Sequence, residues 1–209
     1  MVARAPDVVE SPPRMSDEAW VNLPEDEPGE LVDGVLVEEE GPDWIHESAV
    51  GWLLEALRAW ARPRGGFVGG SELKYLLRLG SGRKPDLSMV LPGQKPPPRR
   101  GAVRRAPDVM IEVVSPRPRD VRRDRIEKLR EYAAFGVRWY WLLDPAMRTL
   151  EIYELGPNGR YFWALGAEGG RVEAVPGCEG LVLDLDGLWA EIDSLGEEEE
   201  PAEGEGEQT

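Results

Sequence analysis

The chain has 209 residues, 41% of them hydrophobic and 31% charged, which is typical of a globular protein with a sizeable core. Its formal net charge of −15 argues against a protein that coats nucleic acid without specificity. A single cysteine, Cys178, and a single histidine, His46, exclude an intrachain disulfide and a Cys/His zinc cluster. The N-terminal segment lacks the apolar stretch of a signal peptide and no apolar run could span a bilayer, so the sequence predicts a cytoplasmic protein with no membrane partner.

The predicted elements of the first half, in chain order, are a loose Pro-rich arm at 1–15, a short helix at 16–23, a hairpin at 29–40, a long helix at 47–61 and a strand at 67–79. Asp33-Gly34, between two apolar runs, is typical of a tight hairpin turn. The strand at 67–79 is expected to bend at Gly69-Gly70.

The second half is predicted to contain strands at 86–91 and 108–114, a helix at 120–135, strands at 137–144 and 149–155, one or two strands within 160–175, a short strand at 181–185 and a short helix at 186–193. Ile126, Leu129 and Ala133, with Tyr132 as a further candidate, are expected on the buried side of the long helix. The acidic segment 194–209 is expected to be disordered. Residues 16–193 then form a single α/β domain, a central mixed sheet flanked by two main helices, with an N-terminal hairpin and a C-terminal β-meander.

A carboxylate inside an apolar strand is the clearest chemical signal. Glu112 lies within Ile111-Glu112-Val113-Val114, and burying its charge is costly unless it is paired or bound to a cation. Asp86 opens the preceding strand, so the two carboxylates converge if these strands are neighbours. Together with a backbone carbonyl and waters they would make a site for Mg²⁺ or Mn²⁺.

The helix after this strand supplies a cation. Asp124, Lys128 and Tyr132 are spaced four residues apart and therefore share one stripe of the helix. A lysine on that stripe could orient or help deprotonate an attacking water and stabilise charge on a phosphate. The alternative is a solvated lysine in a weak i,i+4 ion pair with Asp124.

Seven segments occur in an order that resembles the bacterial family of putative restriction endonucleases, within the PD-(D/E)xK nuclease superfamily. They are ELVDGVLVEE (30–39), His46, KPD (84–86), APDVMIEVVSP (106–116), DRIEKLREYAAFGV (124–137), YWLLDP (140–145) and LEIYEL (150–155). The resemblance covers roughly residues 28–190.

The resemblance implies a restriction-endonuclease-like core of helix, three strands, helix and strand, with a magnesium site. It makes Asp86 the aspartate of the PD motif and Glu112 the acidic residue of (D/E)xK. Val114 stands where the superfamily pattern has lysine, and Lys128 would be the migrated replacement. Family sequences also suggest roles for Glu72 and Tyr132.

Several residues keep two interpretations. His46 could act in the site or only begin a helix, Glu72 in the bent strand is a candidate third metal ligand, and Asp108 could bind metal or accept structural hydrogen bonds. Residues 83–130 hold 14 Lys/Arg against 6 Asp/Glu, and this basic block either is solvated or contacts phosphates. The arginines concerned are Arg99, Arg100, Arg104, Arg105, Arg119 and Arg122.

Three functions follow as hypotheses. The first is a Mg²⁺-dependent endonuclease that cleaves DNA, with RNA also open, acting as a homodimer because such sites often work in pairs. The second is a catalytically inactive nuclease-fold module with a nucleic-acid-binding or regulatory role. Val114 in the lysine position favours this second hypothesis. The third is a protein-interaction scaffold that uses the acidic tail as its contact element.

Overall fold

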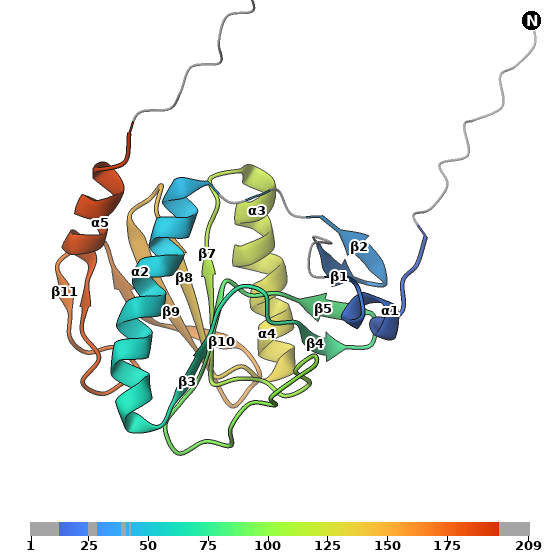
Figure 1. Ribbon diagram of the computed structural model, residues 1–209. Helices are drawn as coiled ribbons and strands as arrows, with labels where there is room; N and C mark the ends of the chain where they lie inside the picture. Colours follow the sequence, from blue (N-terminus) through green and yellow to red (C-terminus); the bar gives the residue numbers. More distant parts are fainter. Residues whose placement is uncertain (1–12, 25–28, 39–40, 42, 197–209) are drawn as a thin grey trace, which may run out of the picture.

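The computed structural model describes residues 13–24, 29–38, 41 and 43–196. At its centre lies a six-stranded mixed sheet with the strand order β10-β9-β8-β7-β6-β3 (Figure 1). Its strands are β3 (Phe67–Gly69), β6 (Leu87–Val90), β7 (Val109–Val113), β8 (Trp139–Asp144), β9 (Thr149–Leu155) and β10 (Tyr161–Ala167). Only β7 and β8 pair in parallel, because the long helix that crosses between them returns the chain in the same direction.

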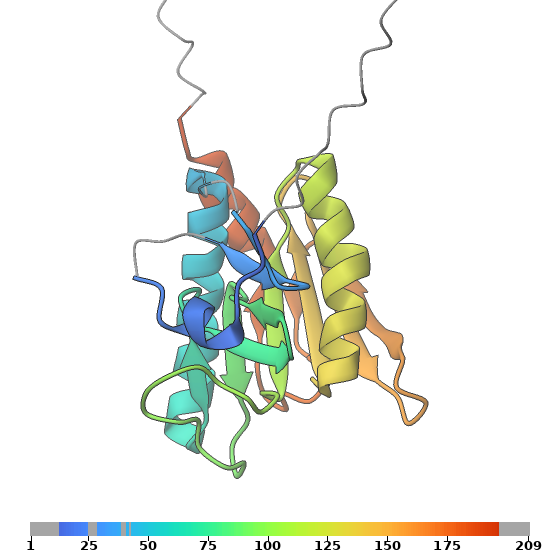
Figure 2. The same ribbon diagram turned by 90° about the vertical axis from the view of Figure 1, so that its right-hand side faces the viewer.

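Helices cover both faces of this sheet, as the view in Figure 2 shows. One face packs against α2 (Trp44–Ala61) and α5 (Leu185–Asp193), in a core that includes Trp139 and Trp141 on one side of β8. The other face packs against a continuous helical stretch made of α3 (Pro118–Arg122), the π-helical segment η2 (Arg123–Lys128) and α4 (Leu129–Phe135). The predicted α/β class with two main flanking helices is confirmed.

A smaller, four-stranded sheet with the order β2-β1-β5-β4 lies beside the first. It contains β1 (Glu30–Val32), β2 (Val35–Val37), β4 (Tyr75–Arg78) and β5 (Ser81–Arg83), and α1 (Asp17–Val21) packs Trp20 against it. The predicted hairpin around Asp33 is therefore confirmed, and Asp33 adopts a φ of 49° there.

The single bent strand predicted at 67–79 is wrong. The chain forms β3 in the large sheet, turns, and forms β4 in the small sheet. A Cβ on Gly69 would lie 2.2 Å from the Leu73 side chain, so the turn folds back onto β3 more tightly than a bent strand would. This turn carries the chain from the large sheet to the small one, and the segment between β5 and β6 returns it.

Short elements complete the chain. A 3₁₀ turn, η1 (Arg62–Arg64), ends α2, and a two-stranded ribbon of β11 (Arg171–Val172) and β12 (Leu183–Asp184) precedes α5. The first long helix begins at Trp44 rather than at residue 47, because the Asp43 side chain accepts a hydrogen bond from the His46 backbone N–H at 2.8 Å and caps the helix. His46 therefore lies in the first turn of α2.

The helix at 118–135 buries a polar stripe. Its buried residues are Asp120, Asp124, Lys128 and Tyr132, whereas Ile126 is 42% exposed and Leu129 and Ala133 are only partly buried. The expectation that Ile126 is buried was wrong, because the i,i+4 stripe of charged residues faces the ends of β6 and β7 instead. π-Helical segments are rare and often occur at functional sites, and this one carries Asp124 and Lys128.

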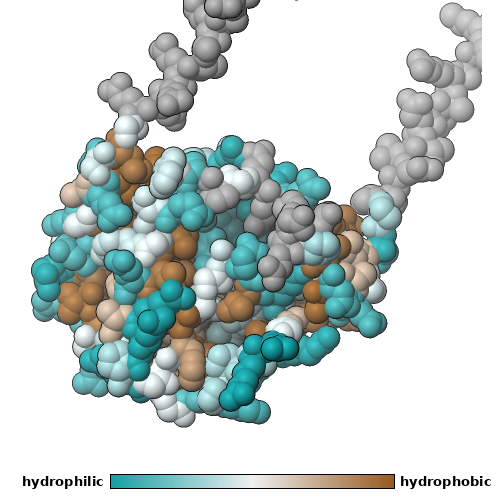
Figure 3. Space-filling view, in the orientation of Figure 1, coloured by the Kyte–Doolittle hydropathy of each residue, from teal (hydrophilic) through white to brown (hydrophobic). Residues whose placement is uncertain are grey.

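The surface seen in Figure 3 is mixed, with small apolar areas broken up by hydrophilic side chains. Within the described residues, no helix has both the length and the apolar character needed to cross a bilayer. The predicted N-terminal arm and acidic tail fall mainly at 1–12 and 197–209, outside the described residues.

Cys178 is buried in the core beneath α2, and burial, together with the charge of Asp108, raises the pKa of its thiol to about 12. Because the thiolate is the reactive form, we expect the native protein to resist thiol reagents. Labelling with a chromogenic disulfide under native conditions should proceed at least about tenfold more slowly than in denaturant. Equal rates in the two conditions would show that Cys178 is accessible.

Candidate active site

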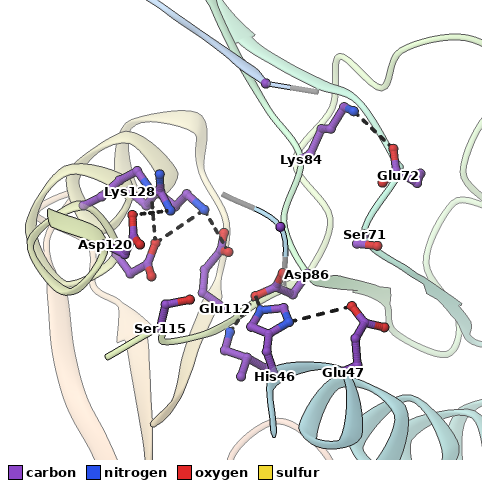
Figure 4. A pocket seen from close by; sticks show the side chains of 15 residues that line it. His46, Glu47, Ser71, Glu72, Lys84, Asp86, Glu112, Ser115, Asp120 and Lys128 are labelled. Atoms are coloured by element: carbon purple, nitrogen blue, oxygen red, sulfur yellow. Dashed lines mark hydrogen bonds and ion pairs between the residues drawn. The ribbon is translucent and has the colours of Figure 1, made fainter. Parts of the chain in front are cut away.

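A polar pocket of about 250 Å³ opens between the N-terminus of α2, the start of β6, the end of β7 and the helix α3–η2 (Figure 4). Its side-chain and backbone lining is formed by Gly29, Gly41, His46, Glu47, Ser71, Glu72, Lys84, Asp86, Glu112, Val113, Ser115, Asp120, Arg123, Asp124 and Lys128. The three residues singled out from the sequence, Asp86, Glu112 and Lys128, all line it.

Strand pairing brings the first two carboxylates together. Leu87 pairs with Ile111 in the antiparallel β6–β7 ladder, which places Asp86 beside the end of β7 that carries Glu112. Asp86 is fixed there because its Oδ2 accepts a hydrogen bond from the Val113 backbone N–H at 2.7 Å. His46 Nε2 lies 3.3 Å from the same oxygen. Both contacts use Oδ2, so Oδ1 is the oxygen with which Asp86 could bind a cation.

Glu112 is held by the helix that crosses the site. Its side chain is 2% exposed, and its Oε2 accepts a hydrogen bond from Lys128 Nζ at 2.9 Å. Its Oε1 accepts one from the Tyr132 hydroxyl at 2.5 Å. The structure thus brings Lys128 and Tyr132 to the carboxylate from successive turns of one helix, while Val114 is buried among apolar residues.

Lys128 is the centre of a buried cluster of charges. Besides Glu112, its Nζ lies 3.4 Å from Asp124 Oδ1 and 3.8 Å from Glu30 Oε1. All of these side chains are at most 4% exposed, so the ammonium group is surrounded by carboxylates with little water to screen them.

Glu30 and Arg83 are site residues that the sequence analysis missed. Glu30 Oε2 accepts a hydrogen bond from Arg83 Nη1 at 2.6 Å, and its Oε1 accepts one from the Lys84 backbone N–H at 2.8 Å. Arg83 Nε also donates to Glu131 Oε2 at 2.7 Å. Burial alone would raise the pKa of Glu30, but Lys128 and Arg83 outweigh it and hold the pKa at about 2. The sequence did contain a signal for Glu30: it is a carboxylate at the start of an apolar strand, just as Glu112 is a carboxylate within one.

The pKa values of Glu112 and Asp124 are shifted in the opposite direction to that of Glu30. Burial raises the pKa of Glu112 well above its usual value, the neighbouring carboxylates of Asp86, Asp124 and Glu30 raise it further, and Lys128 opposes them. Burial also raises the pKa of Asp124, against the effects of Lys128 and Arg123. Acidic residues outnumber lysines and arginines in the pocket lining, so a bound cation would favour the charged form of both carboxyls.

His46 couples α2 to the carboxylates. Burial acts to lower the pKa of its imidazole, but the hydrogen bond and charge of Asp86, with Glu47 and Asp43, outweigh burial and raise it. Glu47 Oε1 lies 3.9 Å from His46 Nδ1, on the side of the ring away from Asp86. The ring is thus placed between two acidic residues.

The other two candidate ligands, Glu72 and Asp108, do not join Asp86 and Glu112. Glu72 lines the pocket, but its carboxylate accepts a hydrogen bond from Lys84 Nζ at 3.1 Å and its side chain is 76% exposed. Asp108 lies at the opposite end of β7, about 13 Å along the strand from Glu112. Its Oδ2 accepts a hydrogen bond from the Leu91 backbone N–H at 2.8 Å, which is the structural role considered for it.

The arginines of the basic block fall into two groups. Four lie in the loop between β6 and β7, which leaves the sheet at the end far from the pocket: Arg99, Arg100, Arg104 and Arg105. The other two, Arg119 and Arg122, are exposed on α3, near the pocket wall formed by Asp120 and Arg123. Arg123, which the sequence analysis did not single out, lines the pocket itself.

The donor atoms fit a divalent cation. Among the described residues, no three His, Cys, Asp or Glu side chains form a ready-made metal cluster. Mg²⁺, however, usually takes one or two protein carboxylates, and waters and substrate phosphates complete its shell. Asp86 and Glu112 supply two carboxylates, and the excess of buried acidic groups favours a cation between them.

Comparisons with known proteins identify a family and a similar fold. A family model described as "Uma2: Putative restriction endonuclease" matches residues 17–186. The fold is similar to a crystal structure described as a putative nuclease belonging to DUF820 from Anabaena variabilis ATCC 29413, with a TM-score of 0.66 and 19% sequence identity. That match covers 85% of this chain and 99% of the other. A search of curated proteins finds no match.

Proposed function

The chain belongs to the Uma2 family of putative restriction endonucleases, and from this premise we propose that it is a divalent-metal-dependent endonuclease that hydrolyses phosphodiester bonds of DNA. The observation that carries the proposal is the convergence of Asp86, Glu112 and Lys128 in one pocket. Two carboxylates and a lysine are the groups that metal-assisted phosphodiester hydrolysis requires.

Each side chain has a defined part in the proposed reaction. Asp86 and Glu112 would hold Mg²⁺ or Mn²⁺, which when bound would supply a Lewis acid to polarise the phosphodiester and to lower the pKa of water. Lys128, 2.9 Å from Glu112, orients the attacking water and stabilises the negative charge that develops on the phosphate. His46 fixes Asp86, and Tyr132 fixes Glu112, so that both carboxylates are positioned before substrate arrives.

Cations around the pocket favour a polyanionic substrate. Lys84 and Arg123 line the pocket, and Arg119 and Arg122 are exposed on the adjoining helix. Phosphate contacts of this kind position a nucleic acid without reading its sequence. A homodimer would present two such sites, one for each strand of a duplex.

The decisive assay is nicking of supercoiled plasmid by purified protein, with Mg²⁺ or Mn²⁺ and with EDTA. We expect cleavage with either metal and none with EDTA, because the carboxylates need the cation to act on phosphate. Asp86→Asn should reduce the metal-dependent rate at least about 100-fold, because it removes one of the two charges that hold the cation. Cleavage that persists in EDTA, or equally in Asp86→Asn, would refute the proposal.

Absence of cleavage on DNA and on RNA would favour the second hypothesis, an inactive nuclease-fold module. One feature of the structure agrees with that alternative: both oxygens of Glu112 accept hydrogen bonds from side chains of the same helix. Each oxygen still has a second lone pair, so in an active enzyme the cation would bind Glu112 through a lone pair that these hydrogen bonds leave open.

A further inference from the structure

A second pocket, of about 410 Å³, lies beside the candidate active site. It is formed by the N-terminus of α2, the segment that follows β7, the turn between β8 and β9, and the end of α5. His46 and Ser115 line both pockets. Since His46 Nε2 lies 3.3 Å from Asp86, one wall of the second pocket touches a proposed metal ligand.

The lining of this second pocket is mostly apolar, with polar groups at its edge. Its apolar surface is formed by Ile45, Val114, Pro116, Pro145, Ala146, Ile192 and Leu195. Polar groups stand at the rim, where Arg148 Nη2 donates to Asp193 Oδ1 at 2.5 Å and joins the turn to α5. Apolar walls with a few polar groups are the usual composition of a small-ligand pocket.

Arg148 is also held in an uncommon conformation, with a φ of 51°. Like Asp33 in the β1–β2 hairpin, which has a φ of 49°, Arg148 closes a hairpin turn in the left-handed region. Its guanidinium can donate two parallel hydrogen bonds, which is the commonest way in which a side chain recognises the edge of a guanine. The rim of the pocket therefore carries a group suited to the edge of a base.

We propose that the second pocket receives one unpaired nucleobase, from a nucleotide next to the phosphate in the candidate active site. This inference rests on the proposed nuclease function, because continuity with the phosphate site is what selects a base from among flat ligands. A base in a duplex is stacked and paired, and it must leave the helix to enter a pocket, at a cost in free energy. The preferred substrate is therefore single-stranded or locally unpaired nucleic acid, such as the underwound stretches of a supercoiled plasmid.

The test fills the pocket without touching the metal site. Ala146→Trp places an indole in the pocket from an exposed position in the turn, where the backbone φ is not positive. Met147→Trp is the matched control, because Met147 is the next residue, is 69% exposed and is not part of the pocket lining. Binding is measured by fluorescence anisotropy in EDTA, so cleavage plays no part.

We expect Ala146→Trp to weaken binding of a short single-stranded DNA about tenfold, because the indole occupies the apolar space in which the base would be buried. Met147→Trp should change it less than about twofold, and neither variant should change binding of the corresponding duplex. As a measurement on the wild type alone, 2-aminopurine within the single strand should change its fluorescence on binding, and Ala146→Trp should abolish that change.

Equal affinities of wild type and Ala146→Trp for single-stranded DNA would overturn the proposal, as would an equal loss on single strand and duplex, or no binding by the wild type. RNA of the same sequence identifies the source of the base: weakening of both nucleic acids means that the pocket reads the base alone, and weakening of one means that it also reads the sugar. A wild type that shows these binding effects but no metal-dependent cleavage would refute the proposed function and not the base pocket.

Discussion

Glu112→Gln is expected to lower metal-dependent cleavage at least about 100-fold while leaving the fold intact. Glutamine keeps the size of the side chain and can still accept a hydrogen bond from Lys128 or Tyr132, but it lacks the charge that binds the cation. DNA binding in EDTA should stay the same or become tighter, because one negative charge facing the phosphate is removed. Plasmid nicking and DNA-binding anisotropy measure the two effects.

The matched control is Glu127→Gln. Glu127 lies on the same helical segment as Lys128, but its side chain is 45% exposed and pairs only loosely with Arg122, at 3.7 Å. The Glu127→Gln variant should cleave at the wild-type rate. If Glu112→Gln also cleaved at the wild-type rate, the activity would belong to another site or to a contaminant, and the mechanism would be wrong.

Lys128→Met is expected to destabilise the protein by about 3–5 kcal/mol, because removing one partner leaves buried charge without compensation. Methionine keeps an unbranched side chain of similar length, so the change mainly removes the ammonium group that contacts Glu112, Asp124 and Glu30. Urea unfolding measures the loss. A role confined to orienting water would leave the stability unchanged and reduce only the rate.

Arg130→Ala is the control for this experiment, since Arg130 is an exposed cation two residues along the same helix. Its replacement should change the free energy of unfolding by less than about 0.5 kcal/mol. A loss for Lys128→Met as small as that of the control would mean that Lys128 does not hold the buried carboxylates together.

The sequence was most informative where local periodicity decides position. Alternation along one strand and the pairing of neighbours were enough to place Asp86 near Glu112, and the i,i+4 spacing was enough to place Lys128 and Tyr132 on one stripe. The helical spacing repeats within a few residues, whereas the convergence of the carboxylates also required β6 and β7 to be neighbours in the sheet.

Contacts between distant segments could not be predicted in this way. Glu30 meets Lys128 only because the small sheet docks against the helix, and the two residues lie far apart in the chain. The prediction of a single strand at 67–79 failed for a related reason, because the two ends of this segment belong to different sheets. Ile126 was misplaced because apolar spacing was weighed above the charged stripe, which is buried only through its mutual pairing.

Net charge along the chain also misled the placement of the arginines. Residues 83–130 are basic as a block, but the β6–β7 connection carries Arg99–Arg105 to the end of the sheet far from the pocket. The arginines of α3 are brought close to the site because the helix crosses it. Fewer arginines therefore lie near the carboxylates in the fold than their closeness in the sequence suggested.

The central claim is that Asp86 and Glu112 together bind a divalent cation, and a crystal structure grown with Mn²⁺ tests it most directly. We expect an anomalous peak between the two side chains, about 2.1 Å from a carboxylate oxygen of each. No peak in that pocket at saturating Mn²⁺ would contradict the account.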